Sequence, residues 1–172
     1  MYELHKNEQY FFNQATLHDL GGFLARWSSP CCLCAPLLGK YLRDRGVNVT
    51  ILDIDDRFES MSGFRKYNIY KPEHLKEEFD LILCDPPFFK VSLSQLFAAI
   101  RNLSHGDFSQ KIMVSYLKRR ESAVLGTFAR FGIEPTGYSP TYQTVQKCER
   151  NLVEFYSNFG VRKEQIEIRG NG

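Results

Sequence analysis

The residues best suited to chemistry are four in a row, Asp85, Pro86, Pro87 and Phe88, which follow an apolar run at 79–84. The prolines exclude a helix or ladder pairing directly after the acid, so the run predicts a buried strand that ends at the carboxylate. In an open α/β sheet, ligands bind at this end of the strands. A rigidly held carboxylate beside an aromatic ring could therefore orient a polar group on a flat ligand. The alternative interpretation is a rigid turn that Asp85 caps.

Two further acids, Asp53 and Asp55, stand at the end of another expected strand. Upstream, the sequence predicts a strand, a tight turn at Cys34 and Ala35, and a helix that begins at Pro36. This order suits a nucleoside cofactor, because backbone N–H groups face its polar part and a carboxylate accepts hydrogen bonds from ribose hydroxyls. The glycine-rich fingerprint is absent, which disfavours a pyrophosphate dinucleotide. A solvated strand end is the alternative for Asp53.

Asn68 and the aromatic triplet Tyr10, Phe11 and Phe12 each leave two interpretations open. Asn68 could hydrogen-bond an adenine edge, or it could form an ordinary turn. The three aromatic residues could anchor the chain in the core, or they could cover a flat heteroaromatic ligand.

Composition and charge set the class of protein. The 172 residues are 43% hydrophobic and 24% charged, which predicts one globular domain. The net charge of +2 leaves the partner open, although basic residues cluster at 118–120 and 162–163. No run reaches the ~20 apolar residues of a membrane span, and the first residues lack the layout of a signal peptide. We therefore expect a cytoplasmic protein without a membrane partner.

The five cysteines favour reduced, buried thiols over a disulfide framework. A zinc site at Cys31, Cys32 and Cys34 is disfavoured, because neighbours in a strand face opposite ways and no CxxC or paired-histidine spacing follows. We expect no metal.

The alternation of strands and helices predicts an α/β fold, with a mostly parallel doubly wound sheet and an antiparallel C-terminal strand pair. The expected helices lie at 13–27, 36–45, 93–100 and 118–131, and the expected strands lie at 31–35, 47–54, 64–68, 79–85, 111–116, 133–142 and 150–159. A single Rossmann-like domain is expected over 1–159, followed by a polar, mobile tail at 160–172.

Five stretches together resemble the class I S-adenosylmethionine-dependent methyltransferases. They are residues 9–12, ILDIDDRF at 51–58, FRKYN at 64–68, CDPPF at 84–88 and RNLVEF at 150–155. Within that superfamily, residues 9–158 are most similar to the probable N6-adenine methyltransferases, whose relatives include enzymes that act on ribosomal RNA adenine and on a lysine of elongation factor 1A. The resemblance implies a Rossmann-like N-methyltransferase with S-adenosyl-L-methionine as its cofactor.

The resemblance also implies roles for individual residues. The implied catalytic residues are Asp85, Pro86, Pro87 and Phe88, and the implied cofactor-binding residues are Tyr10, Phe11, Phe12, Cys34, Ala35, Pro36, Asp53, Asp55 and Asn68. Relatives carry an aspartate at the position of Asn68, so its contact with the adenine amino group stays open.

The motif suits methyl transfer to a planar amine. Asp85 and the Pro86 carbonyl could each accept a hydrogen bond from the amino group, while Phe88 stacks on the base. Together with the phrase at 51–58 and the basic clusters, this favours the N6 amino group of adenine in nucleic acid, RNA rather than DNA. The alternative is a lysine of a protein such as a translation factor, which the phrase at 150–155 favours. A cofactor-binding module without catalysis is a third hypothesis.

Overall fold

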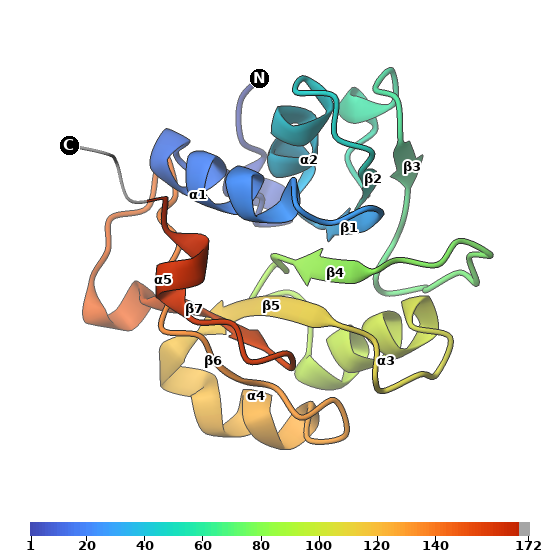
Figure 1. The fold of residues 1–172 in the computed structure, drawn as a ribbon. Coiled ribbons are helices and arrows are strands. Elements are labelled where there is room, and N and C mark those ends of the chain that lie inside the picture. The colour runs from blue at the N-terminus through green and yellow to red at the C-terminus, as the bar shows by residue number, and fades with distance from the viewer. Residues whose placement is uncertain (169–172) are drawn as a thin grey trace.

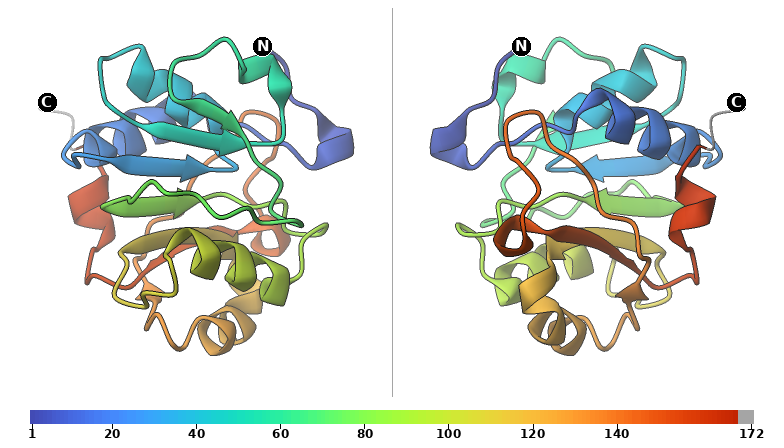
Figure 2. Two further views of the ribbon diagram at one scale, coloured as in Figure 1. Left: turned by 90° about the vertical axis from the view of Figure 1, so that its right-hand side faces the viewer. Right: turned by 90° about the vertical axis from the view of Figure 1, so that its left-hand side faces the viewer.

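The computed structural model describes residues 1–168. They form one sheet in the order β3-β2-β1-β4-β5-β7-β6, with helices on both faces (Figures 1 and 2). The strands are β1 Pro30–Leu33, β2 Thr50–Asp53, β3 Phe64–Lys66, β4 Leu81–Cys84, β5 Ile112–Leu117, β6 Glu134–Pro135 and β7 Val153–Ser157, and the helices are α1 Gln14–Leu24, α2 Pro36–Arg43, α3 Leu93–Leu103, α4 Glu121–Thr127 and α5 Lys163–Ile166. Strands β1 to β5 pair in parallel, whereas β7 is antiparallel to β5 and β6. The predicted Rossmann-like sheet is confirmed.

The central strands are buried on both faces, which explains their continuous apolar runs. Cys31 belongs to the core that α3 and α4 cover, and Cys32 belongs to the core that α1 and α2 cover. Neighbouring strand residues therefore face opposite cores. Burial raises the pKa of Cys32 to about 12, so this thiol stays protonated and packs as an apolar group.

The carboxyl ends of the parallel strands meet at one edge of the sheet. Strand β1 lies between β2 and β4 in the sheet. From β1 the chain forms β2 and β3 on one side of β1 and then crosses to form β4 on the other side. Such a switch point is where α/β folds bind ligands. Directly after β1, Cys34 takes a φ of 57°, an uncommon conformation for a residue other than glycine, and Pro36 begins α2.

The connector between β6 and β7, residues 136–152, forms a wall at this edge with the first residues of the chain. The Gln143 N–H donates to the Phe11 carbonyl at 2.8 Å, and the Asn13 N–H donates to the Thr141 carbonyl at 2.8 Å. Phe12 and Tyr142 form an isolated antiparallel bridge. The predicted N-cap, Asn13, accepts a hydrogen bond from the Thr16 N–H.

Several elements are shorter than predicted. Helix α1 ends at Leu24, and residues 118–120 form a separate turn of 3₁₀ helix before α4. The strand predicted at 133–142 is reduced to Glu134–Pro135. Pro135 has no N–H for a ladder, and Gly137 turns the chain away with a φ of 80°.

Residues 160–168 of the predicted polar, mobile tail pack against the core. Val161 and Ile166 are buried in the core beside α1, and α5 contacts that helix. The Arg26 guanidinium donates to the Gln165 carbonyl at 2.8 Å. Two apolar residues five positions apart match neither the helical nor the strand period, so the sequence carries no periodic signal for this packing. The remainder of the predicted tail, 169–172, lies outside the described residues.

Within residues 1–168, no helix has the length and apolar character needed to cross a membrane. In the same part of the chain, no three His, Cys, Asp or Glu side chains gather as metal ligands.

Candidate active site

A pocket of about 160 Å³ opens at the carboxyl edge of the sheet. Its walls come from the N-terminal segment, here residues 3–12, and from the turns after β1, β2, β3 and β4. All predicted site residues except Asp55 line it: Tyr10, Phe11, Phe12, Cys34, Ala35, Pro36, Asp53, Asn68, Asp85, Pro86, Pro87 and Phe88. The fold thus brings two groups of predicted residues, separated in sequence, to one cavity.

Asp85 is held by side chains from β5 and from the connector at 136–152. Its Oδ1 accepts hydrogen bonds from the Ser115 hydroxyl at 2.5 Å and from the Tyr142 hydroxyl at 2.7 Å. Its N–H donates to the carbonyl of Leu33 at 3.1 Å, which continues the pairing of β4 with β1. Both donors act on one oxygen, and within residues 1–168 no side chain or backbone group donates to Oδ2. The second carboxylate oxygen is therefore available to a ligand.

The environment of Asp85 changes its acidity. Burial raises the pKa of this carboxyl to about 7, while the hydrogen bonds from Ser115 and Tyr142 act in the opposite direction. An acid with this pKa exchanges a proton near neutral pH, unlike an exposed aspartate. It can accept a hydrogen bond when ionised and can also take up a proton.

The turn after Asp85 is fixed through its backbone. The Glu8 carboxylate accepts hydrogen bonds from the N–H groups of Phe89 and Lys90, at 3.0 and 3.1 Å. The Tyr116 hydroxyl donates to the Phe88 carbonyl at 3.2 Å, and the two rings meet edge to face with centroids 5.4 Å apart. The N-terminal segment therefore contacts the loop that carries the predicted catalytic residues.

Asp53 ends β2 with its carboxylate in the pocket. Its Oδ1 accepts a hydrogen bond from the Asp55 N–H at 2.8 Å, and burial raises its pKa to about 6. A buried carboxylate gains from hydroxyl donors. The vicinal hydroxyls of a ribose would supply such donors.

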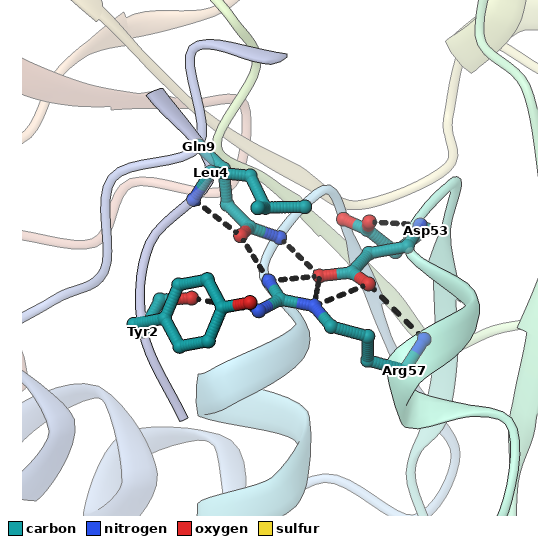
Figure 3. A network of polar contacts seen from close by, with 6 residues as sticks. Tyr2, Leu4, Gln9, Asp53 and Arg57 are labelled. Carbon is teal, nitrogen blue, oxygen red and sulfur yellow. Dashed lines mark hydrogen bonds and ion pairs between the residues drawn. The ribbon is translucent and has the colours of Figure 1, made fainter. Parts of the chain in front are cut away.

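Asp55 lies outside the pocket, although the family resemblance implies that it binds the cofactor. Its Oδ2 accepts from Arg57 Nη2 at 2.7 Å and from Gln9 Nε2 at 2.8 Å (Figure 3). Arg57 also donates to Gln9 Oε1 at 2.9 Å and to the Tyr2 carbonyl at 3.0 Å. Burial acts to raise the pKa of Asp55, but the hydrogen bonds from Arg57 and Gln9 lower it below its usual value. Asp55 thus anchors the N-terminal segment instead of lining the pocket.

Asn68 and the aromatic triplet line the pocket and also have structural roles. Asn68 lines the pocket, while its Oδ1 accepts from the Tyr70 N–H at 2.9 Å and so forms a turn. Phe11 and Phe12 are buried core residues that also line the pocket, whereas Tyr10 is partly exposed and stacks on His5.

Three contributors escaped the sequence analysis: Ser115, Tyr142 and Glu8. Ser115 is a single polar residue within a fully buried strand, and a buried hydroxyl needs a partner. That signal was available in the sequence. Tyr142 and Glu8 lie in segments without periodicity, so only the fold reveals their contacts.

The family model described as "Probable N6-adenine methyltransferase" matches residues 3–161. No curated protein sequence matches the chain significantly.

Solved structures of several methyltransferases share the fold. A candidate RNA methyltransferase from Pyrococcus horikoshii has 16% identity and a TM-score of 0.57, with 91% of this chain and 89% of that chain covered. The E. cuniculi Mtq2-Trm112 complex, which methylates the termination factor eRF1, has 14% identity and a TM-score of 0.56, with coverage of 87% and 97%. Human N-acetylserotonin methyltransferase in complex with SAM has 13% identity and a TM-score of 0.52; the match covers 83% of this chain and 50% of that enzyme. At these identities the likeness shows the fold alone.

Proposed function

The chain belongs to the probable N6-adenine methyltransferase family, and from this premise we propose that it transfers a methyl group from S-adenosylmethionine to the N6 amino group of adenine in nucleic acid, RNA in preference to DNA. The family predicted from the sequence is confirmed. The observation that carries the proposal is that Asp53 and the turn at 85–88 line the same pocket.

The residues present fit a nucleoside cofactor. Asp53 would accept hydrogen bonds from the ribose hydroxyls, and the Asn68 side chain would face the adenine. The turn at Cys34 and Pro36 and the rings of Phe11 and Phe12 supply apolar walls. S-adenosylmethionine bound there would supply an electrophilic methyl group on its sulfonium. No metal enters the proposal.

Asp85 would orient the adenine amino group. Ser115 and Tyr142 already donate to Oδ1, so the other oxygen, Oδ2, would accept a hydrogen bond from one N–H of the amino group. The Pro86 carbonyl would accept a hydrogen bond from the other N–H. These bonds return electron density to a nitrogen whose lone pair is delocalised into the ring. Phe88 would stack on the base, and positioning would supply much of the rate.

A protein lysine is the second candidate substrate. The observation that favours it is the pKa of Asp85, raised to about 7 by burial, because a carboxyl of this kind can take the proton that an ammonium must lose before it attacks. The similarity to a complex that methylates a translation factor is a likeness of fold and gives no further support.

A labelled-methyl assay separates these substrates. Purified protein and methyl-labelled S-adenosylmethionine would be incubated with RNA, DNA and protein from cells, and the label would be located in each fraction. We expect label in RNA as N6-methyladenosine, a signal that Asp85→Asn abolishes and that the exposed control Glu59→Gln retains. Label found only in protein, as methyllysine, would overturn the nucleic-acid proposal.

A further inference from the structure

A second cavity of about 450 Å³ adjoins the first at the turn after β4. Tyr10, Phe88 and Tyr142 line both cavities. The second one, here called the outer groove, extends over Phe89 to the end of β5 and to the connector at 144–146. A substrate whose reacting group lies beside Asp85 would therefore pass its adjoining part into this groove.

The floor of the outer groove is an aromatic surface. Phe89 is 70% exposed. Its backbone is fixed, because the Glu8 carboxylate accepts from its N–H. Tyr10 also lines the groove, and its ring stacks on His5 with centroids 5.1 Å apart. The exposed Phe89 ring and the partly exposed Tyr10 ring thus give the groove an aromatic lining that another molecule can contact.

Two arginines, Arg119 and Arg120, follow the end of β5 beside the groove. The Arg119 guanidinium carbon lies 6.0 Å from the centroid of the Phe89 ring. Arg120 follows Arg119 in the same turn of 3₁₀ helix, just after Leu117, which lines the groove. Arg119 and Arg120 are exposed, and neither forms an ion pair with a carboxylate of residues 1–168. Their charges are thus available to phosphate.

We propose that the outer groove binds the nucleotide next to the target base in single-stranded nucleic acid. The neighbouring base stacks on Phe89 and Tyr10, and its phosphate contacts Arg119 and Arg120. This inference rests on the proposed function. Alternating rings and cations are the usual platform for unpaired bases, because every base has a flat face. Bases within a duplex already stack on each other and would not reach these rings.

Binding of a defined RNA tests the groove. The probe is a fluorescein-labelled RNA of about eleven nucleotides with one central adenosine among uridines, and its anisotropy is followed with the wild-type chain and with variants. We expect Phe89→Ala to weaken binding about tenfold, and Phe89→Trp to bind at least as well as the wild type. The main-chain N–H that contacts Glu8 remains in both variants. The same RNA in a duplex should bind more weakly than the single strand.

A matched pair of arginine variants tests the phosphate contact. Arg119→Gln should weaken binding and reduce the slope of log affinity against log salt by about one. Arg101→Gln, which removes an exposed charge at the end of α3, should change neither quantity. Thermal unfolding would show that each variant is folded.

The outcomes separate this inference from the proposed function. If RNA is methylated at N6 of adenine but Phe89→Ala and Arg119→Gln leave both the RNA affinity and the KM unchanged, the groove proposal is overturned and the function stands. If only protein is methylated, the function fails and the inference fails with it. Methylated RNA together with weakened binding by both variants supports both.

Discussion

The Tyr142 hydroxyl donates a hydrogen bond of 2.7 Å to Oδ1 of Asp85, which links the connector between β6 and β7 to the turn after β4. Ser115 donates to the same oxygen from within β5. The two donors fix the plane of the carboxylate and direct its other oxygen into the pocket. Tyr142 is therefore a positioning residue that acts through Asp85.

Tyr142→Phe should lower kcat about tenfold, the loss expected for one hydrogen bond to a charged group. Since this bond favours the ionised carboxylate, its removal should also raise the pKa of Asp85 and move the acidic limb of the pH–kcat profile upward. Tyr138→Phe, which removes a hydroxyl on the same connector that donates to Asp19, is the matched control. A lower kcat with an unshifted pH profile would contradict the positioning role.

Asp85→Asn should remove a dependence of stability on pH. Asp85 has a pKa of about 7 in the folded chain against a usual value of 3.8. Between these pH values the folded state binds a proton that the unfolded state has lost, so the free energy of unfolding falls as pH rises. Asp53 acts in the same direction up to about pH 6.

Urea unfolding at pH 5 and pH 8 would measure this effect. The wild type should lose on the order of 3 kcal/mol through Asp85, whereas Asp85→Asn should lose much less. Asp55, with a lowered pKa, finishes its titration below this window. Equal losses in the two proteins would show that the Asp85 carboxyl does not carry the dependence.

Arg57→Gln should raise the KM for S-adenosylmethionine several-fold with little change in kcat. Arg57 binds Asp55 and Gln9, so its loss frees the N-terminal segment from the wall of the cofactor pocket. Steady-state kinetics at saturating RNA would measure the change. Arg65→Gln, which removes only an exposed ion pair with Glu77, should leave the KM unchanged. The same KM in both variants would argue against a role of the segment in cofactor binding.

Gly63→Ala should lower the free energy of unfolding by about 3 kcal/mol. Gly63 has a φ of 83°, and a Cβ there would lie 2.5 Å from the Val49 carbonyl oxygen and would also contact the Arg43 guanidinium. Gly46→Ala is the matched control, because its φ of 78° is similar but a Cβ there would have no atom of residues 1–168 within 4 Å apart from its chain neighbours. It should cost about 1 kcal/mol. Equal costs in urea unfolding would refute the steric explanation.

The sequence could predict the fold and most of the pocket because both depend on local signals. Apolar runs that end in Asp53 and Asp85 identify parallel strands, and the carboxyl ends of such strands share an edge. Contacts between irregular segments carry no such signal. The bond from Tyr142 to Asp85 joins residues 57 positions apart, and the engagement of Asp55 by Gln9 depends on where the first residues fold back. The burial of Val161 and Ile166 likewise depends on α1.

Glu8 anchors the loop after β4 through the N–H groups of Phe89 and Lys90 and uses neither side chain of those residues. Every amino acid except proline supplies the same donor. A mutation at position 89 can therefore replace the exposed ring while the loop stays attached to the N-terminal segment. Anchoring and surface chemistry are separate properties at this position, so selection can alter one without disturbing the other. Directed evolution of substrate preference would best begin by varying residue 89.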